Sequence, residues 1–245
     1  MRKRLFEETS FPRLIAHRGF TPLAPENSLF AFEAAGRLGF WAIESDVHET
    51  RDGALVCCHN PDTGGRFNAA LCIAESTLAE LRRLRFTSGN RVELLDDDEL
   101  LLPTFEEYLA ICRKYGAVPF LESKAPVAGK ILAALRKYDL IHHAVFSSTE
   151  FSHLEEARSI DPNIFLHHIF TTREQLERLA ELGNGGVSWN YPDPASAPPE
   201  RIAETKKHGV RVCLRAADSP ERLRIMIDLK LDYIPTNILI PKGGK

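Results

Sequence analysis

The chain has 245 residues, of which 44% are hydrophobic and 27% are charged, and its net charge is −3 at pH 7. This length supports a full hydrophobic core, either in two small domains or in one large α/β barrel. The slightly negative charge creates no overall field that would attract nucleic acid or an anionic membrane, so any recognition of phosphate has to be local.

The N-terminal residues MRKR resemble the start of a secretory signal peptide, but the next residues, LFEETSFPR, contain no apolar stretch. We therefore expect no secretion signal, and no apolar run approaches the roughly 20 residues of a membrane-spanning helix. The five cysteines include no CxxC pair, which favours reduced thiols and argues against a structural zinc site. These features predict a cytoplasmic protein that does not insert stably into membranes.

Short β-type runs alternate with helical segments along the chain. Eight β-type runs are expected at 14–17, 42–47, 118–122, 144–147, 164–169, 186–189, 210–214 and 233–235, with a short extended piece at 55–59. Helices are expected at 28–38, 104–115, 127–138, 150–159, 173–182, 199–208 and 220–229. Thr104 and Glu107 have the spacing of a capping box at the start of the second of these helices.

Eight strands, each but the last followed by a helix, in a chain of 245 residues have the size and order of a (β/α)8 TIM barrel. A doubly wound open sheet is the alternative, but no glycine-rich dinucleotide loop follows the first strand. No repeat or linker divides the chain, so we expect one domain over residues 1–245. The irregular stretch at about 60–102 is then an insertion after the second strand.

Ionisable residues stand at the ends of several predicted strands, where a barrel has its active site. The first strand ends at His17 and Arg18, and the extended piece ends at His59. The second strand ends in AIESDV and the third in FLESK, and residues two apart in a strand share a face. The residues that share a face in this way are Glu44 with Asp46, and Glu122 with Lys124.

Three carboxylates packed together repel one another unless positive charge compensates them. Ligation by oxygen alone suits Mg²⁺ or Ca²⁺ better than zinc, and Mn²⁺ is a third candidate. We therefore predict a divalent metal held by Glu44, Asp46 and Glu122.

The other residues at the strand ends suit a phosphate and proton transfer. Arg18 could bind two phosphate oxygens at once through its guanidinium, and Lys124 could attract the phosphate as a point charge. Each of the two could instead have only a structural role, Arg18 as a clamp under the loop and Lys124 as the ion-pair partner of an acid. His17 and His59 could act as general base and general acid near neutral pH. A metal, cationic groups and an acid/base pair together indicate phosphoryl transfer or phosphoester cleavage.

The motifs HRG, PEN, IESDVHETRDGALVCCH and LESK, in this order, resemble the signature of the glycerophosphodiester phosphodiesterases. That signature consists of HRG, PENT, an E-x-D pair, T-x-DG, HD and a later E-x-K. The resemblance is dense over about the first 60 residues and extends to Lys124, and several ordered motifs are far more specific than HRG alone. It implies a barrel of the phosphatidylinositol-phospholipase-C-like superfamily with a small insertion after the second strand.

Position by position, the resemblance implies that His17 and His59 form the acid/base pair and that Arg18 and Lys124 lie near the phosphate. It implies the same three metal ligands, Glu44, Asp46 and Glu122. The implied reaction is metal-dependent hydrolysis of a small glycerophosphodiester to an alcohol and glycerol phosphate. Whether water attacks directly, or the substrate's own hydroxyl attacks first, stays open.

The chain departs from the family pattern at four places, the first of which is that the RTT that often follows HD is missing, with TGGRFN in that region instead. The family's HD is here His59 followed by Asn60, and its final TD is Thr236 followed by Asn237. Where the family often has WTVND, this chain has RAADS, so Arg215 stands at the position of an aromatic wall residue. We therefore expect Arg215 to contact the substrate, and the alcohol group to differ from the commonest one in the family.

Two other functions are open. One is a related lyase that forms a cyclic phosphate from a lysophospholipid or inositol lipid, although the insertion shows no clear apolar rim. The other is a barrel that binds a phosphorylated ligand without turnover, against which the paired histidines and three acids argue. The sequence does not specify the alcohol, the native metal or the oligomeric state.

Two further expectations concern residues around the site. Asn27 is expected to cap the helix at 28–38 rather than to take part in chemistry. In the doublet of His167 and His168, we expect His168 to be the better candidate for contact with a ligand.

Overall fold

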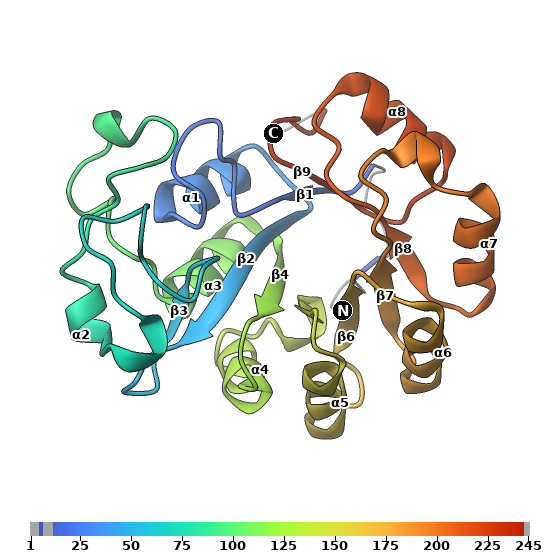
Figure 1. The fold of residues 1–245 in the computed structure, drawn as a ribbon, viewed down its shortest axis with the longest axis horizontal. Coiled ribbons are helices and arrows are strands. Elements are labelled where there is room, and N and C mark those ends of the chain that lie inside the picture. The colour runs from blue at the N-terminus through green and yellow to red at the C-terminus, as the bar shows by residue number, and fades with distance from the viewer. Residues whose placement is uncertain (1–4, 7–11, 243–245) are drawn as a thin grey trace.

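The computed structural model describes residues 5–6 and 12–242. Within these residues, parallel strands surround a central axis and helices cover their outer side, so that Figure 1 looks onto one end of a barrel. This confirms the predicted (β/α)8 architecture. The MRKR segment, on which the prediction about a secretion signal depends, lies outside the described residues.

The elements follow the predicted alternation. The strands are β1 (Leu14–Ala16), β2 (Ala42–Glu49), β3 (Leu55–Cys57), β4 (Val118–Ser123), β5 (Val145–Ser148), β6 (Phe165–Ile169), β7 (Gly185–Ser188), β8 (Arg211–Cys213) and β9 (Ile234–Thr236). The α-helices are α1 (Leu29–Arg37), α2 (Leu78–Leu81), α3 (Phe105–Tyr115), α4 (Ala128–Lys137), α5 (Phe151–Ile160), α6 (Arg173–Leu182), α7 (Pro199–Lys207) and α8 (Pro220–Asp228). Short 3₁₀ helices occur at Ile73–Glu75, Val92–Leu94, Ile141–His143 and Pro194–Ser196.

The parallel strands pair in the order β8-β7-β6-β5-β4-β2-β1-β9, and β3 pairs antiparallel with β2. In the described part of the chain, β8 and β9 are not paired as strands. Asp232 bridges them instead, because its backbone N–H donates to the Val212 carbonyl and its carboxylate accepts from the Val212 N–H, both at 2.9 Å. The barrel is therefore nearly closed.

Side chains alternate between the two sides of each strand, as the two-residue period of β-structure requires. In β2, Ile43 and Val47 belong to the apolar core between strands and helices, whereas Ala42 belongs to the core inside the barrel. Glu44 and Asp46 share the inward side with Ala42, but lie nearer the carboxyl end of the strand. The inward side of β2 thus contributes an apolar side chain to the core near the start of the strand and two carboxylates near its carboxyl end.

The amino-terminal end of the barrel interior is filled by apolar side chains. Its core residues are Ile15, Ala42, Val118, Phe120, Val145, Phe165, Cys213 and Tyr233. The ring of Phe6 packs against them, with its centroid 5.0 Å from that of Phe165 and 5.5 Å from that of Trp41. The guanidinium of Arg211 lies 3.8 Å from the centroid of the Phe6 ring. This packing leaves the carboxyl ends of the strands as the open end of the barrel.

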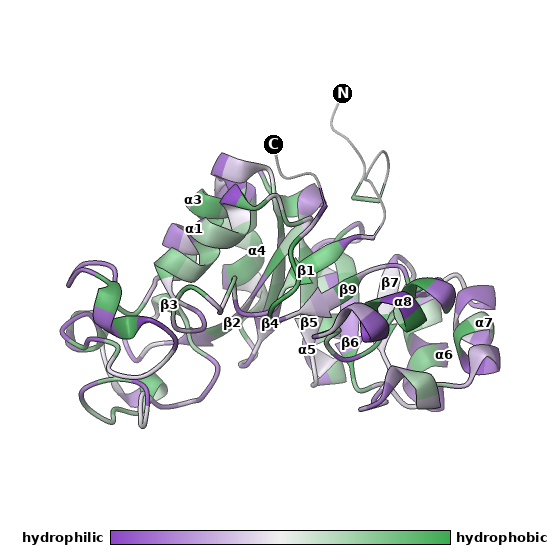
Figure 2. Ribbon diagram, turned by 90° about the horizontal axis from the view of Figure 1, so that it is seen from above, coloured by the Kyte–Doolittle hydropathy of each residue, from purple (hydrophilic) through white to green (hydrophobic). Residues whose placement is uncertain are grey.

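Residues 60–102 form the predicted insertion between β3 and α3, and they lie to one side of the barrel in both views (Figures 1 and 2). They contribute to a separate apolar cluster, in which the rings of Phe67 and Phe86 stack with centroids 4.1 Å apart. Arg66 of this segment makes an ion pair with Glu26 at 2.9 Å, which ties the insertion to the loop after β1.

The starts of two helices test the predicted caps. The capping box of α3 is confirmed, because the Thr104 hydroxyl accepts from the Glu107 N–H at 3.2 Å and the Glu107 carboxylate accepts from the Thr104 N–H at 2.8 Å. The expectation that Asn27 caps α1 is wrong. Ser28 is the cap, accepting from the Ala31 N–H at 3.2 Å, while Asn27 has a left-handed backbone (φ 53°) that turns its side chain toward β2.

Among the described residues, no helix has both the length and the apolar character needed to cross a bilayer.

Candidate active site

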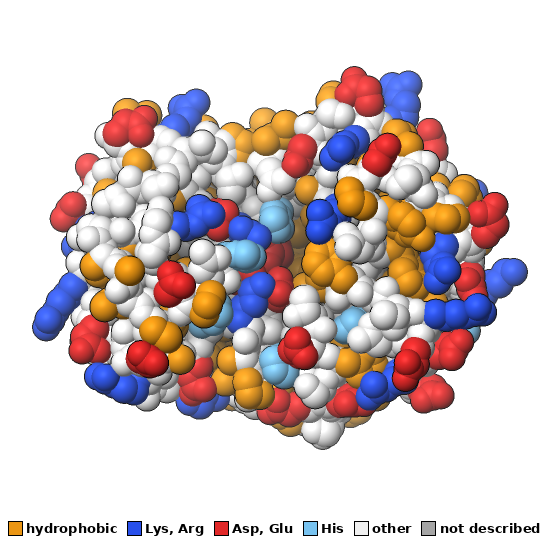
Figure 3. All heavy atoms as spheres, viewed as in Figure 1, with side chains coloured by type: hydrophobic (Ala, Val, Ile, Leu, Met, Phe, Trp, Pro, Cys, Tyr) orange, Lys and Arg blue, Asp and Glu red, His pale blue; other side chains and the backbone are white. Residues whose placement is uncertain are grey.

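A cavity of about 560 Å³ opens at the carboxyl ends of the parallel strands. Figure 3 shows it as the central hollow, with histidines and charged side chains on one side and hydrophobic side chains on the other. Seven of the eight predicted site residues line it: His17, Arg18, Glu44, His59, Glu122, Lys124 and Arg215. The eighth, Asp46, is 1% exposed and lies in the same cluster as Glu44 and Glu122.

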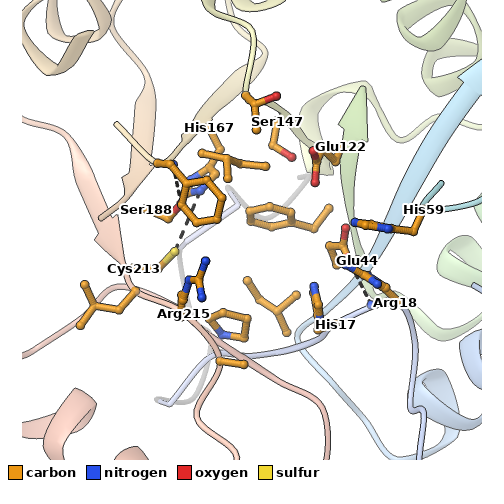
Figure 4. Close-up of a pocket in the computed structure, with 18 of the residues that line it drawn as sticks. His17, Arg18, Glu44, His59, Glu122, Ser147, His167, Ser188, Cys213 and Arg215 are labelled. Atoms are coloured by element: carbon orange, nitrogen blue, oxygen red, sulfur yellow. Dashed lines mark hydrogen bonds between the residues drawn. The ribbon is translucent and has the colours of Figure 1, made fainter. Parts of the chain in front are cut away.

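Strands β2 and β4 bring the three carboxylates together. The two strands are parallel neighbours, and their register pairs Asp46 with Glu122. One carboxylate oxygen from each of Glu44, Asp46 and Glu122 lies within 4.8 Å of the others. Figure 4 shows Glu44 and Glu122 turned toward the same side of the cavity. The inward side of two adjacent strands therefore concentrates negative charge at one point.

Burial has the largest influence on these carboxylates. It raises the pKa of Glu44 well above its usual range, and the charges of Asp46 and Glu122 act in the same direction. Burial and the charge of Asp46 also raise the pKa of Glu122. Burial acts upward on Asp46 too, but Lys124 and Arg18 outweigh it and hold the pKa of Asp46 below its usual value. Glu44 is thus the carboxylate that most lacks a compensating positive charge.

Two cationic side chains contact the cluster. The Lys124 ammonium lies 2.5 Å from Glu122 Oε1 and 3.0 Å from Asp46 Oδ1. Arg18 has a left-handed backbone (φ 57°), uncommon for a residue other than glycine, and its N–H donates to Glu44 Oε2 at 2.7 Å. Its guanidinium donates to both oxygens of Glu26, at 3.0 and 3.1 Å. Both predicted phosphate-contacting residues therefore lie at the cavity and are also paired with acids.

Carboxyl groups outnumber cationic side chains in this network. Its members are the carboxylates of Glu26, Glu44, Asp46 and Glu122 and the cations Arg18, Arg66 and Lys124. Closely spaced carboxylate oxygens with excess negative charge are what a hard divalent cation such as Mg²⁺, Ca²⁺ or Mn²⁺ requires. The donor set therefore fits the predicted metal.

The orientation of His17 is fixed by a chain of two side chains. Asp218 accepts from both Asn237 donors, the backbone N–H at 2.8 Å and the side-chain Nδ2 at 2.6 Å. Because a carboxylate only accepts, the amide carbonyl of Asn237 has to face His17, whose Nδ1 lies 2.8 Å away. His17 Nδ1 is then the donor, which leaves the lone pair on Nε2. Burial, together with the charge of Arg18, lowers the pKa of His17.

His59 has a partner of the same kind. Its Nδ1 lies 2.9 Å from Oδ1 of Asn60, the neighbouring residue. In Figure 4 the rings of His17 and His59 both point into the cavity, on the side of Glu44. Each of the two histidines is thus held through Nδ1 by a neutral amide, at the positions where the chain departs from the HD and TD motifs.

Asn27 is a site residue that the sequence analysis did not assign. Its Nδ2 donates to Asp46 Oδ2 at 2.9 Å, and its Oδ1 accepts from the Ser45 hydroxyl at 2.9 Å. It therefore orients the buried carboxylate of Asp46. The signal that could have identified it was its place in the PEN motif, but Asn also suits a helix cap.

His167 lines the cavity, and His168 does not. Burial lowers the pKa of His167 to about 3, and its Nδ1 lies 2.7 Å from the Tyr233 hydroxyl. His168 lies outside the barrel interior, where Nδ1 is 2.6 Å from Thr171 Oγ1 and Nε2 is 3.1 Å from the Thr149 carbonyl. The preference for His168 was wrong, and the inward Phe165 two residues before His167 was the signal that could have identified it.

Arg215 stands on the wall opposite the acids. It follows β8, and in Figure 4 its guanidinium points into the cavity from the side away from His59 and Glu122. Its guanidinium carbon lies 5.2 Å from the centroid of the Phe170 ring. The predicted site residues therefore occupy two facing walls.

The chain matches one family model, described as the glycerophosphoryl diester phosphodiesterase family, over residues 17–238. Among curated proteins, it is 26% identical to a glycerophosphodiester phosphodiesterase of Caldanaerobacter subterraneus subsp. tengcongensis, with 94% of this chain and 98% of that protein covered. It is 22% identical to a glycerophosphodiester phosphodiesterase of Bacillus subtilis, with 91% of this chain and 82% of the relative covered.

Solved structures share the fold. A glycerophosphodiester phosphodiesterase from Parabacteroides distasonis superposes with a TM-score of 0.76 at 25% identity, covering 92% of each chain. A phosphodiesterase from Oleispira antarctica, in complex with the product sn-glycerol-3-phosphate, superposes with a TM-score of 0.82 at 24% identity. That superposition covers 92% of this chain and 93% of the other.

Proposed function

Because the chain belongs to the glycerophosphoryl diester phosphodiesterase family and is a glycerophosphodiester phosphodiesterase, we propose that it hydrolyses its substrate with a divalent metal and with His17 and His59. The products are an alcohol and glycerol phosphate. The observation that carries this proposal is the cluster of Glu44, Asp46 and Glu122, whose oxygens lie within 4.8 Å of one another at the cavity that both histidines line.

The three carboxylates would hold the metal, and Asn27 would keep Asp46 oriented by its hydrogen bond. A bound divalent cation would polarise a phosphoryl oxygen and offset the negative charge of the diester. Lys124, which lies between Asp46 and Glu122, would add positive charge on the same side of the phosphate. Arg18 would hold Glu44 in place through its backbone N–H and present its guanidinium at the cavity edge.

His17 is the proposed general base. Its tautomer places the lone pair on Nε2, and its lowered pKa keeps the imidazole neutral near pH 7. His59 is the proposed general acid, which donates a proton to the leaving alcohol oxygen. Its ring lines the same cavity as Glu44 and Glu122, and its Nδ1 is held by Asn60 Oδ1 at 2.9 Å.

The substrate would be a small soluble glycerophosphodiester. The Oleispira antarctica relative holds sn-glycerol-3-phosphate as product, and the cavity of about 560 Å³ has room for a diester of that kind. The same proposal treats the chain as a single barrel domain, with 60–102 as an insertion within it, acting in the cytoplasm. It includes neither nucleic acid as a partner nor stable insertion into a membrane.

Phosphorus NMR of a reaction with glycerophosphoethanolamine, in Mg²⁺, Mn²⁺ or Ca²⁺, tests the proposal. We expect the diester signal to be replaced by that of glycerol phosphate, and chelation with EDTA to stop the conversion. A cyclic phosphate that accumulates and persists would indicate the lyase instead. Binding of the diester without any product would indicate a barrel without turnover.

The contact between Asn237 and His17 leads to a separate prediction. Asn237→Ala removes the acceptor that fixes the His17 tautomer, and we expect kcat to fall about three- to tenfold, the net value of one hydrogen bond. The ¹⁵N shifts of His17 should change from an Nδ1–H pattern to a mixture of tautomers. The exposed Asn163, at the other end of the barrel, provides the control Asn163→Ala. Unchanged ¹⁵N shifts in Asn237→Ala would contradict the positioning role.

A further inference from the structure

The cavity wall opposite the acids carries its own positive charge. Arg215, after β8, and Arg222, on α8, both line the cavity, together with the aromatic ring of Phe170, after β6. Within residues 5–6 and 12–242, neither arginine has a carboxylate within ion-pair distance. The nearby Asp218 is engaged through both oxygens by Asn237. Asp218 also lines the cavity, but in the described part of the chain it forms no ion pair with either arginine, so this wall presents two guanidinium groups that are not paired with a carboxylate.

Phe170 is held in an uncommon conformation that supports Arg215. Its backbone is left-handed (φ 58°), a conformation with a cost for a bulky residue, and its N–H donates to the Ser188 hydroxyl at 3.3 Å. Phe170 is 45% exposed and lines the cavity, and the Arg215 guanidinium carbon lies 5.2 Å from its ring centroid. A cation–π contact restrains the guanidinium while leaving its N–H donors free for an acceptor.

On the cavity wall that carries the acids, the cationic side chains are paired with carboxylates, unlike Arg215 and Arg222. Arg18 donates to Glu26, and Lys124 contacts Asp46 and Glu122, so their charge is largely used within the network of acids. A phosphodiester bound beside the acids has its alcohol portion free to extend across the cavity. In that orientation, Arg215 on the opposite wall would face the alcohol portion rather than the phosphate.

We propose that the alcohol portion of the preferred substrate carries an anionic group, a carboxylate or a second phosphate, that Arg215 binds. This inference rests on the proposed function and specifies its substrate class. Arg222 contributes a second, weaker contact. A carboxylate or phosphate matches the fork of N–H donors that a guanidinium presents.

The test uses pairs of substrates that differ in one anionic group. Glycerophosphoserine and glycerophosphoethanolamine differ by a carboxylate, and glycerophosphoinositol 4-phosphate and glycerophosphoinositol differ by a phosphate. We expect the wild-type kcat/KM to be about tenfold or more higher for the anionic member of at least one pair, the scale of one charged hydrogen bond. The pair that shows the difference identifies the group.

Arg215→Gln should remove this preference by lowering kcat/KM only for the anionic member, and Arg215→Lys should restore part of it. Arg224, exposed on the same helix as Arg222 but outside the cavity, provides the control Arg224→Gln, which should keep the preference. An equal loss for both members in Arg215→Gln would mean that Arg215 contacts the shared phosphate, and would overturn the inference. A wild-type enzyme without preference, or with a preference for the uncharged members, would overturn it as well.

Failure of the proposed function has a different signature, because wild-type enzyme with metal would then hydrolyse none of the four diesters. In that case, calorimetric titration with the same pairs decides the inference. Tighter binding of the anionic member, lost in Arg215→Gln, would support it, and equal binding within both pairs would overturn it.

Discussion

Replacing His17 by alanine is expected to lower kcat by about 10²- to 10⁴-fold, the usual contribution of a general base. The reason is structural: His17 is the histidine whose tautomer is fixed by the Asp218–Asn237 pair and whose Nε2 lone pair is free. Steady-state assays with a glycerophosphodiester and saturating metal measure the effect. His142 is exposed and far from the cavity, so His142→Ala is the matched control. Activity within a factor of a few of wild type in His17→Ala would refute the assignment.

The pH dependence of the wild-type enzyme tests the same residue. Burial and the charge of Arg18 lower the pKa of His17 from 6.5, so the imidazole stays neutral at pH 6.5 and above. A base works only when it is unprotonated, so kcat/KM should fall as the pH drops through the lowered pKa. The acidic limb of the profile should therefore lie below pH 6.5. An acidic limb above pH 7 would contradict this account of His17.

Glu44→Gln is expected to have opposite effects on activity and on stability. Glutamine keeps the shape of the side chain and an acceptor for the Arg18 N–H, but it removes one of the three carboxylates of the cluster. We expect kcat/KM to fall by about 10²-fold or more, because a metal contributes several kcal/mol to such a reaction. Isothermal titration with Mn²⁺ should show weakened metal binding.

The metal-free variant should nevertheless be more stable than the metal-free wild type. Burial and two neighbouring acids raise the pKa of Glu44, so the folded protein binds this proton more tightly than the unfolded chain does. That preference stabilises the fold fully below the pKa of an unfolded glutamate and is lost as the pH rises through the raised pKa of the folded state. Above the unfolded-state pKa, burial of this carboxyl group therefore opposes folding. Relief of about 1 kcal/mol corresponds to an increase in Tm of about 2–4 °C.

Thermal unfolding in EDTA at pH 7 measures this difference, and repeating it with metal reverses the order. Wild-type protein should gain about 2.7 kcal/mol at a metal concentration of 100 Kd, and the variant should gain much less. Glu93 is exposed in the insertion, so Glu93→Gln serves as the control for loss of one negative charge. A lower Tm for metal-free Glu44→Gln would show that the carboxylate stabilises the fold.

The alternation of strands and helices could be predicted because the spacing of apolar residues along each segment indicates whether it is a strand or a helix. The acids of the site could be predicted for a related reason: Glu44 and Asp46 stand two apart at the end of a strand, and parallel strands end at the same side of a barrel. The spacing of two residues and the place near the carboxyl end of the strand were enough to predict that Glu44 and Asp46 lie in one cavity with Glu122.

The roles of the asparagines depend on contacts that local pattern does not encode. Asn237 and His17 are 220 residues apart in the sequence. They lie within hydrogen-bond distance only because β9 pairs with β1. Asn27 bonds to Asp46 because its backbone is left-handed, and its amino-acid type alone equally suited a helix cap. In both cases, a residue with several common roles received its role from long-range geometry.

The alternation in β2 also has a consequence for folding. If this strand slipped by one residue, Glu44 and Asp46 would face the apolar layer between the strands and the helices. Ile43 and Val47 would then face the cavity at the carboxyl ends of the strands. Each carboxylate left in that layer without a partner would cost several kcal/mol. The charges that serve the reaction therefore also penalise misregistered barrels, so selection for activity and selection for a single strand register act on the same residues.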